Sequence, residues 1–218
     1  MYLTRMELDM SKWDTRKALL SPNMFHGAIE SSFPGERERR LWRVDEFQGR
    51  YYLLLLSEQI PDLSHMANQF GIEGSKQPWQ TKSYDALLEQ IQAGSAWQFR
   101  LTANPTKSVK SPKTGKRGTV CAHITSEYQL KWLLDRCEAH GFSVDLDEVI
   151  VTQSQWQRFY KGEQRKKTVS LLSVTFEGIL TVTDEVRFRQ TLVEGIGRGK
   201  AFGLGLLTVI RLRGSDHE

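Results

Sequence analysis

The sequence predicts an α+β fold built from two consecutive ferredoxin-like (RRM-like) units, each with the element order β-α-β-β-α-β. Two observations support this prediction. Strand-like apolar stretches and helices with one apolar face follow each other in this same order in both halves of the chain. The length of 218 residues, with 39% hydrophobic residues, is enough for two small cores. We therefore expect an N-terminal domain at residues 1–90 and a C-terminal domain at residues 97–214.

The first half is expected to begin with a strand at residues 2–8, followed by a helix over about residues 22–33. Ser21 can accept hydrogen bonds from the first N–H groups of this helix, and Pro22 suits its first position because no donor is needed there. The later elements are, in order, a strand entered through the charged stretch 36–43, a buried strand at 51–57, a helix at 63–70 ended by Gly71, a strand at 79–83, and a connection within 71–96.

The second half repeats this order without any repeat at the level of individual residues. Its first strand, 97–103, alternates apolar and polar residues and ends at Asn104-Pro105. The later elements are, in order, a helix from Thr125-Ser126 to Gly141, strands at 142–151 and 169–180 with a basic hairpin at 156–167 between them, a helix capped by Asp184 and running to about Glu194, a glycine-rich loop, and a strand at 206–212.

Charge and composition narrow the class of protein. The chain has 30 Lys and Arg residues against 26 Asp and Glu residues, a net charge of +4. No apolar run approaches the 18 or so residues of a membrane span, and the first residues lack the apolar core of a signal peptide. Two cysteines give no disulfide framework, which fits a reducing compartment. We expect a soluble, cytoplasmic protein.

A glycine-rich stretch at residues 195–206 has glycine at 195, 197, 199, 203 and 205, with Arg198 and Lys200 as its charges. Such a backbone can bring its N–H groups close to a phosphate. It can equally be a loop that needs glycine only for its turns. Because the stretch follows a helix and precedes a strand, it is the reverse of a dinucleotide-binding loop, and no phosphate-loop motif occurs in the chain.

Two enzymatic alternatives receive little support. Cys121, His123, Cys137 and His140 are residue types that bind zinc, but Cys137 falls on the apolar face of its predicted helix, where a cysteine acts as a small hydrophobe. A serine nucleophile of the Gly-x-Ser-x-Gly kind is not present. We therefore keep zinc only as a remote alternative and expect neither a metal nor another cofactor.

Nucleic acid is the ligand that the basic residues favour. Clustered cations attract phosphates, and neighbouring aromatic rings can stack on bases; two-unit sheets of this kind are common RNA platforms, so RNA is favoured over DNA. Four clusters occur: Arg37, Arg39, Arg40 and Arg43 beside Trp42; Lys107, Lys110, Lys113, Lys116 and Arg117; Arg158, Lys161, Arg165, Lys166 and Lys167 beside Trp156, Phe159 and Tyr160; and Arg198 with Lys200.

His26 is the candidate for proton transfer. It lies near the start of the predicted helix at 22–33, at the margin of the apolar face. An imidazole exchanges protons near neutral pH, and helix N-termini attract anions. A lone histidine at a helix edge can also be merely structural, so the residue pattern alone leaves both readings open.

Several segments together resemble the CasE family, the CRISPR repeat-processing endoribonucleases of the type I-E Cascade complex. The resemblance extends from the first residue to about Leu207. It rests on the start Met1-Tyr2-Leu3-Thr4-Arg5, the helix Ser21-Pro22-Asn23-Met24-Phe25-His26, the strand end Phe99-Arg100-Leu101-Thr102-Ala103-Asn104-Pro105 with Lys107, the segment Val174-Thr175-Phe176-Glu177-Gly178 with Leu180, and the glycine-rich stretch through Leu207.

This resemblance implies a metal-independent endoribonuclease that binds the hairpin of CRISPR repeat RNA and cuts at the base of its stem. Attack by the adjacent 2′-hydroxyl would give a 2′,3′-cyclic phosphate and a 5′-hydroxyl. His26 matches the family histidine and would act as general acid or base. The family expectation is also that the protein stays on the mature guide RNA beside other Cascade subunits, and we expect a monomer when it is isolated.

One departure from the family pattern leaves the second proton-transfer group open. Some relatives carry tyrosine where this chain has Asn23, and an amide is neither an acid nor a base. Lys166 and Lys167 are our candidates to stabilise the phosphorane charge, with Arg158 and Lys161 as further possibilities on the same hairpin. The missing tyrosine also motivates an alternative, a non-catalytic RNA-binding subunit of a ribonucleoprotein complex.

Overall fold

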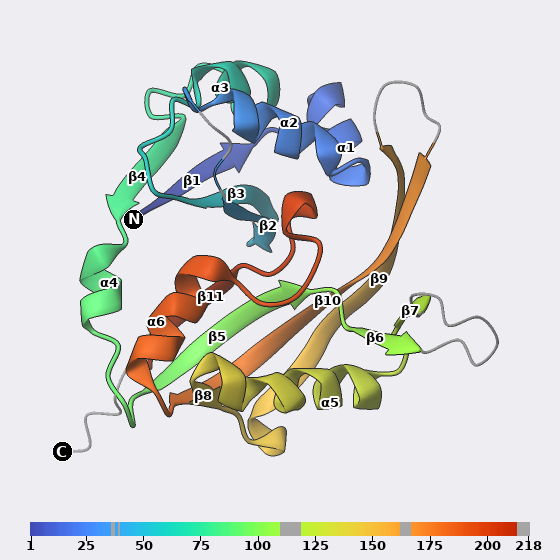
Figure 1. The fold of residues 1–218 in the computed structure, drawn as a ribbon. Coiled ribbons are helices and arrows are strands. Elements are labelled where there is room, and N and C mark those ends of the chain that lie inside the picture. Colours follow the sequence, from blue (N-terminus) through green and yellow to red (C-terminus); the bar gives the residue numbers. More distant parts are fainter. Residues whose placement is uncertain (36–37, 39, 110–118, 162–166, 213–218) are drawn as a thin grey trace.

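The structure is a computed structural model that describes residues 1–35, 38, 40–109, 119–161 and 167–212, with the side chains of 161 and 167 left out. It is an α+β fold with two antiparallel sheets, one from each half of the chain, which pack against each other around the middle of the molecule (Figure 1). Among the described residues, no helix is both long and apolar enough to cross a membrane.

The first sheet contains β1 (Tyr2–Leu8), β2 (Leu41–Phe47), β3 (Arg50–Ser57) and β4 (Trp79–Ser83) in the order β2-β3-β1-β4. All of its neighbouring strands are antiparallel. The helices α1 (Trp13–Leu20), α2 (Asn23–Ser31) and α3 (Ser64–Phe70) enclose a core with this sheet. Phe25 and Ile29, four residues apart, bury the same face of α2 in that core.

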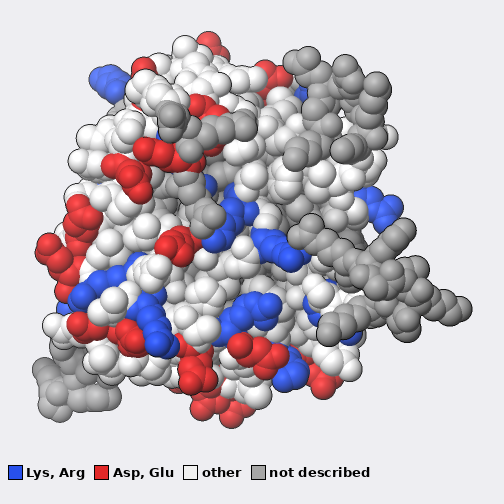
Figure 2. Space-filling view, viewed as in Figure 1, with Lys and Arg blue, Asp and Glu red and all other residues white. Residues whose placement is uncertain are grey.

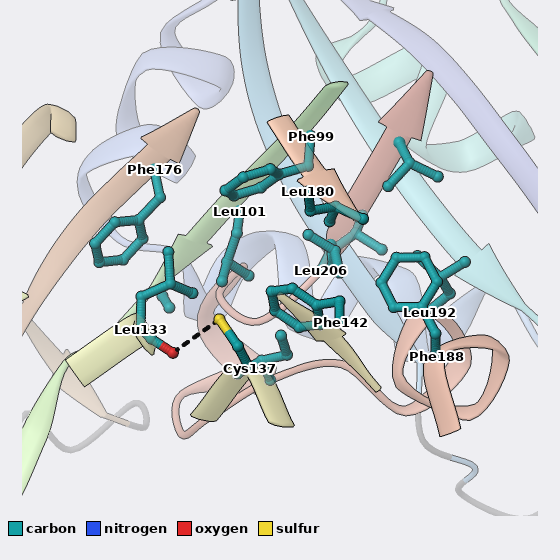
Figure 3. Packing of buried hydrophobic residues seen from close by; sticks show 14 of the residues in the cluster. Phe99, Leu101, Leu133, Cys137, Phe142, Phe176, Leu180, Phe188, Leu192 and Leu206 are labelled. Atoms are coloured by element: carbon teal, nitrogen blue, oxygen red, sulfur yellow. Dashed lines mark hydrogen bonds between the residues drawn. The ribbon is translucent and has the colours of Figure 1, made fainter. Parts of the chain in front are cut away.

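The second sheet has the order β11-β5-β10-β8, and β9 also pairs with β10. Its strands are β5 (Ala96–Ala103), β8 (Phe142–Ser143), β9 (Val149–Lys161), β10 (Lys167–Val182) and β11 (Leu207–Arg211). The helices α5 (Ser126–Cys137) and α6 (Glu185–Glu194) bury their apolar faces against it (Figure 3). Asp184 caps α6 by accepting a hydrogen bond from the N–H of Arg187, as the sequence predicts.

Three smaller features complete the fold. A two-stranded ribbon, β6 (Thr106–Val109) with β7 (Thr119–Ala122), leaves the end of β5. The short helix α4 (Asp85–Glu89) lies in the connection between the halves. The turn η3 (Lys200–Phe202) interrupts the glycine-rich stretch, which we call the glycine loop (residues 195–206).

Arg43 joins the two sheets. Its side chain is 2% exposed, and its Nε and Nη2 donate to the Asp45 carboxylate at 2.6 and 2.7 Å. Its Nη1 donates to the carbonyl oxygens of Arg100 and Leu206, which belong to the second half. The first acceptor lies on β5 and the second at the end of the glycine loop, so this one guanidinium fixes β2 against the second sheet.

The sequence-based prediction was wrong in several places, including the β6–β7 ribbon, which it did not foresee. It missed α1, because only Thr15 and Ala18 of that helix are buried and no apolar stripe marks it. It missed α4, which has no buried residue. The strand expected at 142–151 is two strands, β8 and β9, separated by the turn η2 (Leu146–Glu148), and β9 continues into the predicted basic hairpin. The helix expected at 22–33 is shorter at both ends, as α2 covers Asn23–Ser31.

Candidate active site and nucleic-acid interface

His26 lies in the first turn of α2, where its N–H donates to the carbonyl oxygen of Pro22. Its side chain is 32% exposed, and Nδ1 lies 4.0 Å from a carboxylate oxygen of Glu30, one turn further along the helix. Glu30 also lies 3.6 Å from the guanidinium of Arg40. The imidazole is therefore open to solvent on one side and faces a carboxylate on the other, an arrangement that can orient the ring for proton transfer.

Asn23, one turn before His26, is engaged at the helix start. Its Oδ1 accepts a hydrogen bond of 2.7 Å from the hydroxyl of Ser21. The amide thus helps to fix the beginning of α2 and leaves His26 as the titratable group at this end of the helix, among the side chains that the structure describes there.

The glycine loop brings α2 together with the second half, because η3 lies against α2. The loop is packed rather than slack. Gly203 has φ +77°, and a Cβ there would lie 2.8 Å from the Trp42 ring. Phe202 contacts Phe159 of β9 edge to face, with ring centroids 4.9 Å apart. The loop therefore ties the helix of His26 to β9 near the tip of the β9–β10 hairpin.

Many amides of the glycine loop are already used. Those of Gly195, Ile196, Phe202, Gly203 and Gly205 donate to carbonyl oxygens of the protein. The Lys200 ammonium donates to the carbonyl oxygen of Glu194 at the end of α6. These five amides could bind a phosphate only if their present hydrogen bonds broke, and positive φ together with close packing accounts for glycine at 195, 203 and 205.

The first predicted basic cluster is only in part as expected. Arg43 is buried between the sheets and Trp42 is 3% exposed, so neither can meet RNA at the surface. The Arg40 side chain is 3% exposed, pairs with Glu30 and Glu38, and lies over the Phe33 ring at 3.9 Å. A phosphate contact from Arg40 would require these partners to move. Arg37 and Arg39 lie outside the described residues.

The β9–β10 hairpin presents one polar aromatic face. Trp156 and Tyr160 are 51% and 53% exposed, and Arg158 is exposed between them. Phe159 points to the opposite face and is buried with Leu171 and Leu204, so it cannot stack on a base. The backbone of Lys161 pairs with that of Lys167. Arg165 and Lys166 lie outside the described residues, as do the side chains of Lys161 and Lys167.

Lys107 and Arg198, 91 positions apart in the sequence, border one pocket of about 510 Å³. We call it the basic pocket; its lining residues are Asn104, Thr106, Lys107, Ser108, His123, Tyr128, Lys131, Trp132, Asp135, Arg136, Gly197 and Arg198. Lys131 and Arg136 were missed from the sequence because they alternate with acidic and apolar residues along α5. A spacing of five residues puts them about 140° apart around the helix, so no signal in the sequence indicated that both border one pocket. Lys110 and Lys113 lie outside the described residues.

Lys and Arg side chains gather on the face of the molecule drawn in Figure 2. Figure 2 shows Lys and Arg side chains gathered across the middle of the face, with Asp and Glu side chains around its upper left, left and lower margins. Burial, together with the charges of Lys107 and Arg136, lowers the pKa of His123 in the pocket. This cationic surrounding is suited to an anion such as a phosphate.

A second hollow, the intersheet cleft, has a volume of about 700 Å³. It is lined by residues of α1, by Arg43, Asp45 and Arg100, by polar uncharged side chains of β9 and β10, and by the later part of the glycine loop, Phe202 to Leu204. Its charges are balanced, because Arg43 and Arg100 pair with Asp45 and Glu177.

The zinc alternative is wrong. Among the described residues no three His, Cys, Asp or Glu side chains come together as a metal site. Cys137 donates to the carbonyl oxygen of Leu133 within the core (Figure 3), and burial raises the pKa of its thiol to about 12. His140 pairs with the hydroxyl of Thr191 instead.

A conserved-domain comparison identifies the class to which this fold and site belong. A family model described as "CRISPR associated protein" matches residues 1–211, so the chain belongs to this family of CRISPR-associated proteins. Within it, the chain is a member of the Cse3/CasE group of endoribonucleases.

Individual relatives agree with this assignment. The CRISPR-associated endoribonuclease Cse3 of Thermus thermophilus is 33% identical over 96% of this chain and 99% of its own. The Cascade subunit CasE of Escherichia coli is 27% identical over 56% of this chain and 62% of its own. A structure of Cse3 bound to a 19 nt RNA superimposes with a TM-score of 0.77 and 29% identity, covering 96% of this chain and 100% of that one.

Proposed function

We propose that the protein is a metal-independent endoribonuclease that binds the hairpin of CRISPR repeat RNA and cuts precursor RNA at the base of the stem. The 2′-hydroxyl beside the scissile phosphate attacks it, and the 5′-oxygen leaves. The products are a 2′,3′-cyclic phosphate and a 5′-hydroxyl. Membership of a family that contains the Cse3 endoribonuclease supports this activity. In the same proposal, each of the two large sheets with its helices is one ferredoxin-like unit.

The observation that carries the proposal is the position of His26. The reaction must remove a proton from the 2′-hydroxyl and deliver one to the departing 5′-oxygen, and a positioned imidazole can do one of these at neutral pH. Its 32% exposure leaves His26 reachable by RNA, while Glu30 lies on the other side of the ring. The turn η3 of the glycine loop contacts α2, and Arg198 of the same loop borders the basic pocket. The loop therefore connects the helix of His26 with the basic surface of the second half, which includes this pocket and the exposed face of the β9–β10 hairpin.

The RNA stem lies along that basic surface in our proposal. Arg158 and the exposed rings of Trp156 and Tyr160 engage it from the hairpin, while Lys107 and Arg198 meet phosphates of the RNA next to the stem. Lys166 and Lys167 stabilise the extra negative charge of the phosphorane, as inferred from their place at the hairpin tip in the sequence. The protein then remains with the mature guide RNA as a subunit of Cascade in the cytoplasm.

The test is cleavage of the cognate repeat RNA in EDTA by the wild type and by His26→Ala. We expect the variant to cut about 10²–10⁴-fold more slowly, the usual contribution of one general acid or base, and to bind the RNA as tightly as the wild type. A substrate with a 2′-deoxy nucleotide before the scissile phosphate should resist the wild type. Undiminished cutting by His26→Ala would overturn the role of His26.

One observation favours a second function, a non-catalytic subunit that only holds guide RNA. Asn23 occupies the position where some relatives have tyrosine, and its amide is bonded to Ser21. If this is the function, wild-type protein binds the repeat RNA but leaves it full length over hours at neutral pH, and His26→Ala behaves identically.

A further inference from the structure

The basic pocket is assembled by segments that are distant in sequence. Asn104 follows β5, Lys107 lies on β6, Tyr128 and Trp132 lie on α5, and Gly197 opens the glycine loop. In Figure 1 these elements meet below the glycine loop, at the end of β5 where the β6–β7 ribbon departs. The volume of about 510 Å³ lies within the range of small-ligand sites, roughly 300–1,000 Å³.

The lining of the basic pocket contains more cationic side chains than carboxylates. Asp135 is the acid in the lining, and it is paired with Lys131 at 3.0 Å. Arg136 lies over the Trp132 ring at 4.2 Å and donates to the Trp132 carbonyl oxygen. Arg198 is exposed at the rim. The pocket thus retains positive charge that the protein does not neutralise among its described residues, which favours an anionic ligand.

Two buried polar atoms in the lining lack hydrogen-bond partners in the described part of the chain. They are Nε1 of Trp132, whose side chain is 3% exposed, and Oδ1 of Asn104. A buried donor and a buried acceptor left unpaired are costly, and a ligand that pairs with both would remove that cost. One N–H donor and one amide acceptor suit the edge of a nucleobase, which carries both kinds of group.

Aromatic surface is available at the same place. The Tyr128 ring is 52% exposed, with Lys107 5.7 Å and the His123 ring 6.0 Å from its centroid. An exposed ring beside cations provides a stacking platform for a base whose phosphate meets those cations.

We propose that the basic pocket binds an unpaired nucleotide of the RNA strand that flanks the repeat hairpin. Tyr128 stacks on the base, Trp132 and Asn104 meet its edge, and Arg136, Arg198 and Lys107 hold the neighbouring phosphates. A paired nucleotide cannot use this pocket, because its base edge is occupied by its partner and its faces by the stack. The protein thereby reads RNA beyond the stem.

This inference rests on the proposed function for the RNA, but its test is separate. Binding is measured with three repeat RNAs that carry a 2′-deoxy nucleotide at the cleavage site: the hairpin alone, the hairpin with its 5′ flank, and the hairpin with its 3′ flank. One flank should tighten binding by the wild type. In parallel, cleavage by each variant is followed with an all-ribose hairpin that ends one nucleotide past the scissile phosphate, which we also call the bare hairpin.

Arg136→Gln and Asn104→Leu are the variants. We expect each to weaken binding of the flanked RNA about tenfold and to leave the bare hairpin's affinity and cleavage unchanged. Arg136→Gln should also lower the dependence of log Kd on log salt by about one for the flanked RNA. Asn104→Leu should keep or raise Tm, since it removes an unpaired acceptor, and so separates ligand loss from unfolding.

Arg50→Gln is the matched control, because Arg50 is 67% exposed on β3 and away from the pocket. It should behave as the wild type with all three RNAs. Equal weakening of flanked and bare RNA by the pocket variants, or no weakening of either, would overturn the proposal. If no RNA is cut but the flank-dependent loss persists, the proposed catalysis fails and the pocket stands.

Discussion

The intersheet cleft and the basic pocket both border the glycine loop and both contain arginines, but these arginines are paired with carboxylates to different extents. In the intersheet cleft, Arg43 and Arg100 are matched by Asp45 and Glu177. In the basic pocket, Arg136 and Arg198 face a single carboxylate, Asp135, which is paired with Lys131. In the cleft the paired charges hold the two halves together, whereas the basic pocket has cations that no carboxylate among the described lining residues neutralises. Counting cations along the chain cannot separate these cases.

Removing Arg43 should cause the largest loss of stability among the substitutions considered. Arg43→Ala leaves Asp45, 16% exposed, without its bidentate partner, and loss of one partner from a buried pair costs about 3–5 kcal/mol. The free energy of unfolding, measured with urea, should fall by that amount. Arg198→Gln, on the exposed side, should change it by less than about 0.5 kcal/mol.

A double variant, Arg43→Ala with Asp45→Ala, serves as the control for this prediction. It should lose less stability than the two single variants added together, because neither charge is then left alone. Strict additivity would mean that the contacts of Arg43 to Arg100 and Leu206, rather than its pairing with Asp45, hold the sheets.

The next largest losses of stability are expected from replacing Gly203, on the cleft side of the glycine loop, and Gly197, on the pocket side. Gly203 and Gly197 both have positive φ, +77° and +82°. A Cβ at 203 would lie 2.8 Å from Trp42 in the cleft, and one at 197 would lie 3.2 Å from Trp132 in the pocket. We expect Gly203→Ala to cost about 2–4 kcal/mol and Gly197→Ala about 1–2 kcal/mol, from strain plus overpacking.

Thermal unfolding compares these two variants directly. Gly197→Ala should in addition weaken binding of flanked repeat RNA, since the added methyl group narrows the basic pocket. A larger stability loss for Gly197→Ala than for Gly203→Ala would contradict the tighter packing on the cleft side.

The smallest expected effect is a loss of stability in acid, caused by His140 near Lys200 and Arg136. Burial, with the charges of Lys200 and Arg136 and against that of Glu194, lowers the pKa of His140. Because the folded state prefers the neutral ring, this contribution is present above the ordinary value of about 6.5 and is lost as pH falls below it. Solvent screening limits the loss to a few tenths of a kcal/mol.

The measurement is the change in unfolding free energy between pH 7.5 and pH 5.5. Wild-type protein should lose slightly more stability over this interval than His140→Gln, which cannot take up the proton. A greater loss in the variant would reverse the sign and exclude His140 as the acid-sensitive group.

Much of the fold was predictable because its signals are local. The start of α2 at Ser21-Pro22, the cap of α6 at Asp184 and the alternation along β5 each depend on a few neighbouring residues. The helix α1 was not predictable in this way, since Trp13 and Leu20 at its ends are 69% and 78% exposed and its apolar pattern is weak.

The sequence alone was enough to predict the α+β class, most of the strands and larger helices, the family, and His26 as the candidate for proton transfer, but not α1, α4 or the β6–β7 ribbon. Which cations are paired inside the protein and which stay exposed became clear only from the tertiary structure. It buried Arg43 and Trp42, turned Phe159 inward, and joined Lys107 and Arg198 with Arg136 in one pocket. The physical reason is that a charge is neutralised or left unpaired by contacts across the fold. Arg43, for example, binds acceptors 57 and 163 positions away, and no local pattern encodes those contacts.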